Sequence, residues 1–308
     1  MSRLVAHSEG VVLSRAGGIY RVHTAGQVVE ATLRGRMKHG TQKHVLVGDH
    51  VTLAMRADGG ATIEAVHERS SILKRRSPGR SRGVRAVAAN VDQVVVVGSA
   101  RDPEWDPSLV DRFTAVAQAN DLPTVVVINK VDLDPAAERH AEPYRQAGYS
   151  VLLTSATREY GIEELRRQLA GRVSLFSGPT GVGKSSLLNA LEPGLRLRTA
   201  AVSRRTRAGR HTTVSAEMHP LGEDGFVVDT PGLRDVGLWG LEPREVAAVF
   251  PEFGEYAAGC RFDNCRHLEE PGCAVADAVG CGALAASRYE SYRLLLEEAE
   301  RAARPWLG

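Results

Sequence analysis

The stretch from Gly178 to Ser185, with the sequence GPTGVGKS, has the residue types and spacing that bind phosphate groups. It fits the pattern G-x-x-x-x-G-K-[S/T], in which glycines let backbone N–H groups approach phosphate oxygens and the following helix N-terminus adds partial positive charge. Lys184 would reach the β- and γ-phosphates, and Ser185 would ligate Mg²⁺. The apolar run RVSLFS before the loop and the helix-like SSLLNALE after it argue against a chance glycine-rich loop. The predicted phosphate-binding residues are Gly178, Pro179, Thr180, Gly181, Val182, Gly183, Lys184, Ser185 and Ser186.

A second motif, Asn129-Lys130-Val131-Asp132, directly follows the apolar run PTVVVI. The Asp132 carboxylate can accept hydrogen bonds from both the N1–H and the exocyclic amine of guanine, a donor pair that adenine lacks. Asn129 would brace the loop, the stem of Lys130 would cover the base, and the segment 154–156 (Thr-Ser-Ala) could offer a backbone N–H to guanine O6. By itself the motif is equally typical of a turn before a helix, but its pairing with the phosphate loop favours GTP over ATP. The predicted base-binding residues are Asn129, Lys130, Val131, Asp132, Ser155 and Ala156.

A third motif, Asp229-Thr230-Pro231-Gly232, follows the apolar run FVV. Asp229 is predicted to hold Mg²⁺ through water, and the backbone N–H of Gly232 can bond to the γ-phosphate. Along the chain the base motif comes first, then the phosphate loop, then this third motif, whereas most GTPases begin with the phosphate loop. The same sheet can form if the chain is cut between the third motif and the base motif and the former ends are joined. The motif order therefore predicts a circularly permuted domain.

Four residues near the carboxy-terminal end, with the spacing C-x4-C-x-H-x5-C, are suited to binding Zn²⁺. Three thiolates and one imidazole make a tetrahedral structural site, and because all four ligands come from the protein we expect no zinc catalysis. In an intracellular chain, clustered Cys and His favour metal binding over disulfides, with buried free thiols as the alternative. Cys281 lies beyond an apolar stretch and is expected to be an ordinary buried thiol. The predicted zinc ligands are Cys260, Cys265, His267 and Cys273.

The elements that must position these motifs fall into successive parts of the chain. Residues 1–72 contain five short runs rich in Val, Ile and Thr at hairpin spacing, which predicts an oligonucleotide-binding (OB) type β-barrel, and residues 73–86 form a basic linker. Residues 87–240 alternate continuous apolar runs with helical patterns, as in a parallel sheet flanked by helices. Residues 241–308 are predicted to be helical around the Cys/His loop. One apolar face of a terminal helix is predicted at Tyr289, Tyr292, Leu296, Ala299 and Ala303.

The predicted fold class is therefore multidomain α/β. It combines an amino-terminal OB-type β-barrel, a circularly permuted P-loop GTPase domain and a carboxy-terminal helical zinc-binding domain. The 308 residues are 43% hydrophobic and 25% charged, which excludes intrinsic disorder, collagen-like repeats and a disulfide scaffold. No apolar run reaches the roughly 18–20 residues that span a membrane, and the first ten residues contain no apolar signal segment. We therefore expect a cytoplasmic protein without membrane contact.

The formal net charge of +2 hides an uneven distribution. Residues 1–85 contain fifteen Lys and Arg against six Asp and Glu, a net charge of +9. Residues 241–308 contain seven Lys and Arg against twelve Asp and Glu, a net charge of −5. A basic amino-terminal third favours a polyanionic partner over a merely solvated basic surface.

Together the motifs resemble one family closely. The stretches INKVD, GPTGVGKSSLLN, GRHTTVSAE, DTPGLRDVGL and FGEYAAGCRFDNCRHLEEPGCAV, spread over residues 90–295, are similar to those of the small-ribosomal-subunit biogenesis GTPase family, RsgA. The resemblance implies an OB barrel, a circularly permuted GTPase domain and a zinc module, although the barrel resembles the family only in type and position. It also implies an enzyme that hydrolyses GTP to GDP and phosphate, acts late in assembly of the 30S subunit and binds the rRNA of that subunit. Hydrolysis is expected to be stimulated by the 30S subunit.

The resemblance bears on two further features. Leu233, directly after DTPG, stands where many GTPases have a water-orienting glutamine, so we expect slow intrinsic hydrolysis unless another group helps. The family points to His211 as that catalytic group, with a solvent-exposed loop histidine as the alternative. Thr212 or Thr213 is expected to ligate Mg²⁺ in the GTP state. The loop before them is predicted to be a solvated switch loop, a contact to ribosomal RNA, or both, and it carries Arg204, Arg205, Arg207 and Arg210.

The sequence thus predicts a monomeric, ribosome-stimulated GTPase that binds GTP or GDP with Mg²⁺, holds one structural Zn²⁺ and has the 30S subunit and its rRNA as partners. The alternative is an RNA-binding module in which GTP is only a structural or switch ligand, and Leu233 is the residue that supports this reading. An ATP-driven transporter or a metabolic kinase is disfavoured by the base motif.

Overall fold

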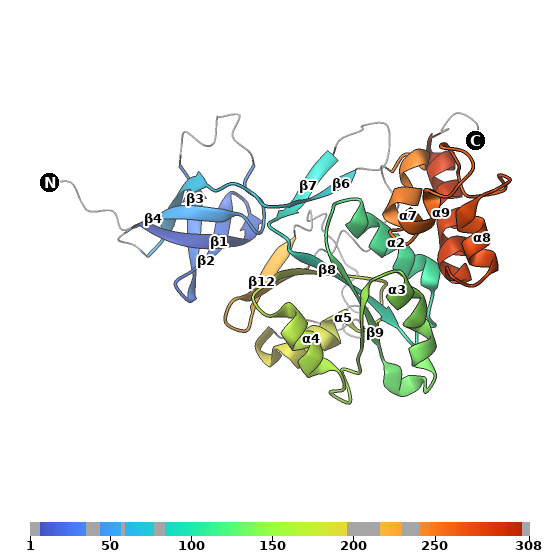
Figure 1. Cartoon of the computed structure of the whole chain (residues 1–308). Coiled ribbons are helices and arrows are strands. Elements are labelled where there is room, and N and C mark those ends of the chain that lie inside the picture. The colour runs from blue at the N-terminus through green and yellow to red at the C-terminus, as the bar shows by residue number, and fades with distance from the viewer. Residues whose placement is uncertain are drawn as a thin grey trace. The chain divides into compact units, whose positions relative to one another are not determined.

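The computed structural model of the chain contains two compact units (Figure 1). One unit contains the described residues before 93, the segment 169–175 and a hairpin within 216–229. The other contains the remaining strands and helices, including the carboxy-terminal ones. The structure describes residues 7–34, 44–56, 59–76, 84–195, 216–229 and 241–303.

The first unit begins with a closed five-stranded barrel, in which the strands are ordered β1-β2-β3-β5-β4. Among the described residues of the barrel, β3 pairs in parallel with β5, and the other neighbouring strands pair antiparallel. Alternate residues point inward, so that Val12, Val22 and Leu53 are fully buried. The predicted barrel is confirmed. Its strands are β1 (His7–Ala16), β2 (Ile19–Thr24), β3 (Gln27–Leu33), β4 (His50–Met55) and β5 (Ala61–Val66).

The segment predicted to be a basic linker, 73–86, includes the ends of two paired strands. β6 (Ile72–Arg76) and β7 (Val84–Ala89) form an antiparallel hairpin. Leu73 and Ala88 oppose one another in this hairpin and are almost completely buried. The charged run was predicted to be a linker, but a few apolar residues at its ends form strands because their side chains are buried.

Asn90, just after β7, ties this hairpin to the barrel. Its side-chain Nδ2 donates to the carbonyl of Gly48 over 2.8 Å, and its Oδ1 accepts from the amide of Ser70 over 2.9 Å. Gly48 has a φ of +88°, and a Cβ there would lie 2.1 Å from the carbonyl oxygen of Ala89. Only glycine allows so close an approach. The barrel and the strand that leaves it are therefore joined by buried backbone contacts.

A second hairpin, β12 (Glu217–Leu221) with β13 (Gly225–Asp229), packs within the same unit. The ring of Phe226 meets His23 of the barrel edge-to-face at 5.6 Å between centroids. Buried Met218 lies against Gly48, where its Cε is 3.2 Å from the position of a Cβ. The apolar-run pattern had not marked β12 as a strand, since it contains a proline and only two hydrophobic residues in five.

The central sheet has the strand order β10-β9-β8-β11-β13-β12. β8 pairs in parallel with β9, and β9 with β10, which confirms the predicted parallel character. All seven residues of β8 are buried, as expected for a strand covered on both faces. The strands and helices of this region, apart from β12 and β13, are β8 (Gln93–Ser99), α2 (Pro107–Gln118), β9 (Thr124–Asn129), η1 (Val131–Leu133), η2 (Ala137–His140), α3 (Glu142–Gln146), β10 (Ser150–Leu153), α4 (Ile162–Leu169), β11 (Val173–Ser177), α5 (Lys184–Leu191) and η3 (Pro193–Leu195).

The carboxy-terminal helices pack on α2 through one hydrophobic cluster, to which Ala115, Phe250 and Tyr292 belong. The predicted apolar face of the last helix is largely confirmed, but Ala303 is exposed because it ends the helix beyond the cluster. No described helix is both long and apolar enough to cross a membrane. The elements are η5 (Pro243–Glu245), η6 (Ala247–Val249), α7 (Phe253–Ala257), α8 (Ala274–Gly280) and α9 (Ala286–Ala303).

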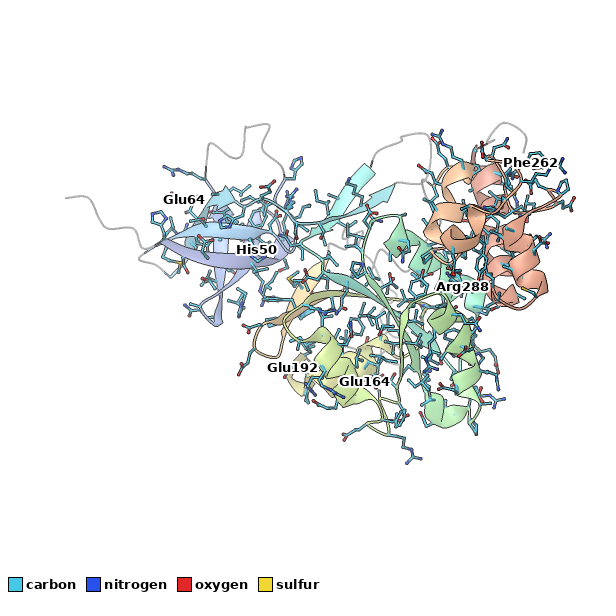
Figure 2. All side chains as sticks on the ribbon, viewed as in Figure 1. His50, Glu64, Glu164, Glu192, Phe262 and Arg288 are labelled. Carbon is cyan, nitrogen blue, oxygen red and sulfur yellow. The ribbon has the colours of Figure 1, made fainter. Side chains whose placement is uncertain are left out.

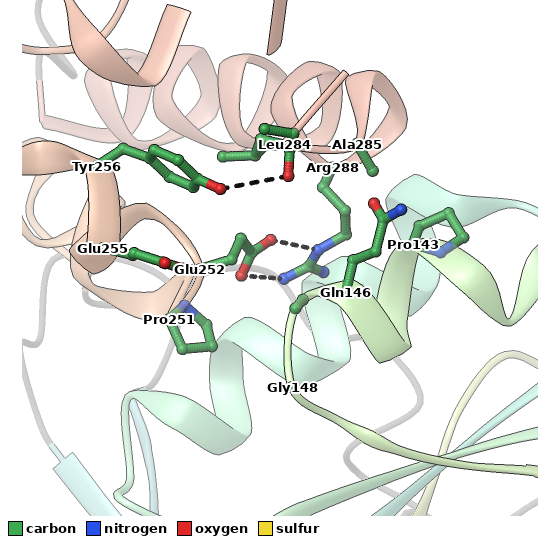
Figure 3. A pocket seen from close by; sticks show the side chains of 12 residues that line it. Pro143, Gln146, Gly148, Pro251, Glu252, Glu255, Tyr256, Leu284, Ala285 and Arg288 are labelled. Carbon is green, nitrogen blue, oxygen red and sulfur yellow. Dashed lines mark hydrogen bonds and ion pairs between the residues drawn. The ribbon is translucent and has the colours of Figure 1, made fainter. Parts of the chain in front are cut away.

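Arg288 on α9 is buried although it is charged (Figure 2). Its Nη1 donates to the Asp111 carboxylate on α2, and its Nε donates to Glu252 over 2.7 Å, a pair drawn in Figure 3. The guanidinium also lies over the ring of Phe250, 4.8 Å from its centroid. Burial raises the pKa of Asp111, although the nearby Arg288 charge opposes this rise. Paired charges and aromatic contacts thus anchor the carboxy-terminal helices to α2.

Replacing Asn90 with Ala is expected to lower the free energy of unfolding by about 1–3 kcal/mol, because the buried carbonyl of Gly48 loses its donor and the Ser70 amide its acceptor. Urea denaturation followed by circular dichroism measures the change. The control variant Gln146→Ala, at an exposed amide on α3, should stay within about 0.5 kcal/mol of the parent. Equal stability of the two variants would show that Asn90 does not hold the hairpin.

Candidate nucleotide-binding site and metal cluster

The phosphate loop connects the end of β11 to Lys184, the first residue of α5. Gly178 has a φ of +134°, and a Cβ there would lie 2.1 Å from the carbonyl oxygen of Val97 in β8. At Gly183, with a φ of +98°, a Cβ would lie 2.3 Å from the side-chain nitrogen of Asn129. Glycine is required at both positions by the backbone angle and by the space. These two glycines let the loop pass close to β8 on one side and to the base motif on the other.

The side chain of Lys184 lies on the phosphate loop itself. Its Nζ donates to the carbonyl oxygens of Gly178, over 2.6 Å, and Pro179, over 2.7 Å. The ammonium is therefore held at the loop, where it can exchange carbonyl oxygens for phosphate oxygens. Half-buried Ser185 follows in the first turn of α5, and the N-terminus of this eight-residue helix adds partial positive charge.

The base motif is bonded directly to the phosphate loop. Buried Asn129 donates from Nδ2 to the carbonyl of Val182 over 2.9 Å and accepts from the Thr154 hydroxyl over 3.1 Å. Lys130, in the left-handed region at a φ of +60°, donates from Nζ to the carbonyl of Gly181 over 2.8 Å. Three segments that are far apart in the sequence thus meet at one place. Thr154 belongs to the segment 154–156 singled out from the sequence, but the bond from its hydroxyl to Asn129 was not predicted, because a buried hydroxyl partner leaves no motif of its own.

The residues expected to read the base edge lie around this junction. Asp132 is exposed in η1, so its carboxylate can accept two hydrogen bonds from a ligand. The amide of Val131 donates to the carbonyl of Thr154 over 3.2 Å, which holds η1 beside the end of β10. The N–H of Ser155 donates to the carbonyl of Tyr160 over 3.0 Å. The N–H of Ser155 thus already has a partner in the protein.

Several predicted residues lie outside the described part of the chain. Asp229 is the last residue of β13, but its side chain is not among the described ones. The same holds for the predicted switch-loop arginines at 204, 205, 207 and 210. The other predicted residues outside the described ranges are His211, Thr212, Thr213, Gly232 and Leu233.

The four predicted zinc ligands lie together in the carboxy-terminal region. Their ligand atoms are all within 4.8 Å of one another. The Sγ atoms of Cys260 and Cys273 are each 3.5 Å from Nδ1 of His267, so this nitrogen faces the thiols. Three sulfurs and one nitrogen suit a tetrahedral site for a soft cation. The predicted cluster is therefore confirmed as one that could hold a metal ion.

Neighbouring groups fix the backbone that carries these ligands. The hydroxyl of Tyr289 donates to the carbonyl of His267 over 2.6 Å, and that of Tyr292 donates to the carbonyl of Arg266. Cys273 also caps α8, since its Sγ accepts from the amide of Ala276 over 3.4 Å. Burial raises the pKa of the Cys265 thiol to about 12. Because burial disfavours the charged thiolate, the thiol ionises here only beside a cation, and this agrees with a metal site.

Cys281 is exposed, so the prediction that it is a buried thiol is wrong. α8 ends at Gly280, and Cys281 therefore follows the last turn on the surface rather than continuing into the core. Its thiol donates to the carbonyl of Ala278 over 3.4 Å. Exclusion of Cys281 from the metal ligands agrees with the composition of the cluster.

Comparison with protein-family models gives two matches. The model described as RsgA GTPase matches residues 66–239, and the model described as RsgA N-terminal domain matches residues 9–63. The first of these covers more than half of the chain, including the base motif and the phosphate loop.

Curated proteins and solved structures agree with these matches. The small ribosomal subunit biogenesis GTPase RsgA of Gemmatimonas aurantiaca is 48% identical over 304 residues, which cover 96% of this chain and 98% of that protein. That of Moorella thermoacetica is 43% identical, with 94% and 97% covered. The crystal structure of YjeQ from Thermotoga maritima superimposes with a TM-score of 0.77 at 34% identity, covering 96% and 99%. The structure of YloQ, a circularly permuted GTPase, gives 0.75 at 30%, covering 97% of each chain. The predicted permuted fold is confirmed.

Replacing Asp132 with Asn is expected to reduce GTP affinity at least about 100-fold relative to xanthosine triphosphate, because the amide no longer accepts both guanine donors. Competition binding with the two nucleotides measures the ratio. The matched control is Asp121→Asn, an exposed carboxylate in the turn after α2, which should keep the parent ratio. An unchanged ratio in the Asp132 variant would mean that another group reads the base.

Purified protein is expected to contain about one Zn²⁺ per chain, and Cys273→Ser should lose it because one thiolate ligand is gone. Cys281→Ser is the matched control, since this thiol lies outside the cluster, and it should keep the metal. Elemental analysis after gel filtration measures the content. Equal zinc in the two variants would exclude the cluster as the binding site.

Proposed function

Because the chain belongs to the RsgA GTPase family it is a GTP hydrolase, and we propose that it acts in late maturation of the small (30S) ribosomal subunit. Its relatives are named small ribosomal subunit biogenesis GTPases, and the chain matches nearly their whole length. In this proposal the 30S subunit stimulates hydrolysis of GTP to GDP and phosphate, and hydrolysis times the release of the protein. We also propose that the protein acts in the cytoplasm and as a monomer.

The basic amino-terminal part is proposed to bind rRNA. Residues 1–85 carry a net charge of +9, and phosphate contacts from Lys and Arg supply sequence-independent affinity for RNA. The proposed division of the chain is a barrel at 1–72, a linker at 73–86, a GTPase domain at 87–240 and a zinc-binding domain at 241–308. The −5 charge of the last part makes it a weaker candidate for an electrostatic contact.

The observation that carries the coupling of RNA binding to hydrolysis is the packing of the β12–β13 hairpin in the barrel's own unit. Besides the Phe226–His23 contact, Arg21 of the barrel pairs with Glu217 over 3.6 Å. β13 ends at Asp229, the first residue of the third motif. A displacement of the barrel on RNA would therefore be passed through the hairpin to the residue proposed to hold Mg²⁺.

The nucleotide site is proposed to work by positioning and charge. Asp132 and the N–H of Ala156 read the guanine edge, and Asn129 and Lys130 hold the base motif against the phosphate loop. The loop from Gly178 to Gly183, with Lys184, would bind the phosphates. Ser185, Asp229 and one of Thr212 and Thr213 would hold Mg²⁺, which would neutralise negative charge on the phosphates.

Hydrolysis transfers the γ-phosphoryl group to water. The water oxygen attacks phosphorus, the bond to the β–γ bridging oxygen breaks, GDP leaves, and the water proton passes to the phosphate formed. Leu233 cannot orient this water because its side chain has no polar atom. His211 is proposed to orient the water, in an arrangement that the 30S subunit completes.

The zinc cluster is proposed to be structural. Cys260, Cys265, His267 and Cys273 would supply all four ligands, so no position is left for substrate. The ion would cross-link the segment between α7 and α8, whose Cys260, Cys265 and Cys273 pack with the hydrophobic cluster on α2.

Purified 30S subunits are expected to raise the GTP turnover of the parent protein at least about tenfold, because the partner completes the water-orienting arrangement. His211→Ala should lose about 100-fold of the stimulated rate while its GDP affinity stays at the parent value. Steady-state phosphate release, with and without 30S, measures both effects.

Two outcomes would contradict the proposal. Absence of stimulation by 30S in the parent protein excludes a ribosome-stimulated GTPase. Full stimulated turnover in His211→Ala assigns water orientation to another group, and RNA affinity that does not depend on nucleotide would favour an RNA-binding module with GTP as a bound ligand only.

A further inference from the structure

The loop between β8 and α2, residues 100–106, lies against the base motif. The amide of Ala100 donates to the carbonyl of Asn129 over 2.8 Å, so the loop starts beside that motif. Lys130 reaches across it, and its Nζ donates to the carbonyl of Asp102 as well as to that of Gly181. The ammonium is thus bonded to the phosphate loop on one side and to this loop on the other. Neither the sequence motifs nor the proposed function uses residues 100–106.

The position of the Lys130 side chain therefore depends on two carbonyl oxygens. Backbone carbonyls hold an ammonium well only if their own segments are already fixed, because a loose segment loses conformational entropy when the bond orders it. The phosphate loop is fixed by its glycine contacts with β8 and by Asn129. The Asp102 carbonyl must be fixed as well if it is to hold the ammonium.

The residues around Asp102 offer little anchoring of their own. Residues 101–104 are exposed, and the Arg101–Glu104 pair, at 3.7 Å, is a surface ion pair of small energetic value. The Ser99 hydroxyl donates to the carbonyl of Arg101 over 2.5 Å, which holds the first residue of the exposed stretch. The far end of the stretch is held by Trp105.

Trp105 is anchored through its ring. The indole stacks on His140 with centroids 5.1 Å apart and an interplanar angle of 23°, and it meets Tyr144 edge-to-face at 5.8 Å. It also covers Gly98, where a Cβ would lie 2.4 Å from the ring. Burial lowers the pKa of His140, which favours the neutral imidazole in this stack.

The same ring packs on a small hydrophobic cluster beneath the base motif. The buried members of the cluster come from β9, from η2 and from the residues that directly follow β8 and η2. Val131, inside the base motif, packs against it together with Trp105. Trp105 is therefore connected to the base motif in two ways. Its ring shares the hydrophobic cluster with Val131, and its backbone leads through residues 102–104 to the Asp102 carbonyl that binds Lys130. Its buried members are Ala100, Ile128, Ala137 and Ala141.

We propose that Trp105 is a positioning residue of the nucleotide site, because its ring fixes residues 100–104 and so holds the Asp102 carbonyl where it binds the Lys130 ammonium. This inference rests on the proposed role of Lys130 at the base. Lys130 contacts the base end of the ligand, so Trp105 supports GTP and GDP equally. It therefore contributes to ground-state binding and not to the hydrolytic step.

Trp105→Ala is expected to raise the dissociation constants for GDP and for a non-hydrolysable GTP analogue by the same factor, about 10- to 30-fold. In turnover stimulated by 30S, KM should rise with kcat unchanged, the signature of lost uniform binding. Trp105→Phe should recover binding to within about threefold, since a smaller ring can still stack on His140. Calorimetric titration and steady-state kinetics measure these quantities on the full chain.

The matched control is Phe250→Leu, which alters a buried aromatic residue of the same unit that packs on Arg288 and α9 instead. It should lower the melting temperature and keep the parent dissociation constants. If Trp105→Ala is too unstable to purify, Trp105→Leu retains apolar volume without the stack and should show the same rise.

Parent-like GDP and analogue affinity in Trp105→Ala or Trp105→Leu, with only a lowered melting temperature, would overturn the positioning role. A changed kcat at constant KM would overturn it as well. These results leave the proposed function intact, whereas a parent protein that binds no guanine nucleotide overturns the proposed function itself.

Discussion

The hydrogen bond from the Asn129 side chain to the Val182 carbonyl joins two loops that lie 53 residues apart in the sequence. Asn129 is buried, so loss of this partner would leave a polar group unsatisfied away from water. The bond can form only because Gly183 lets the phosphate loop pass next to the amide, and because β9 and β11 both end at this place. The residues proposed to recognise the base and to bind the phosphates therefore belong to one bonded assembly rather than to two separate motifs.

The permuted order changes what is attached to that assembly. The barrel precedes β8, and the carboxy-terminal helices follow the third motif along the chain. Each attachment is stiffened by buried polar groups: Asn90 and Gly48 at the barrel, and Arg288 with Asp111 at the helices. Bonds of this kind are costly to break, because each would leave a buried group without a partner. Both flanking parts are thus held firmly to the segments they contact, which suits a protein whose hydrolysis is proposed to respond to a large partner.

The sequence was most informative where chemistry imposes residue types at fixed spacing. The glycines and Lys184 of the phosphate loop, the base motif and the Cys/His ligands all had recognisable patterns, and the barrel strands were marked by short runs rich in Val, Ile and Thr at hairpin spacing. Long-range packing left no such trace. β12 lacks an apolar pattern, and the strand ends of β6 and β7 flank a charged run, so both pairings depended on partners that the local sequence does not contain. Likewise, nothing near Arg288 or Trp105 reveals Asp111 or His140 as a partner.

The junction of the base motif and the phosphate loop is expected above all to make nucleotide binding specific for guanine. The decisive measurement is a pair of calorimetric titrations of the full chain with GDP and with ADP, at equal Mg²⁺ and ionic strength. The tie between Asn129 and Val182, with Asp132 at the base edge, predicts saturable binding of one GDP per chain and ADP binding at least about 1000-fold weaker. Comparable affinities for the two nucleotides would contradict a guanine site at this junction.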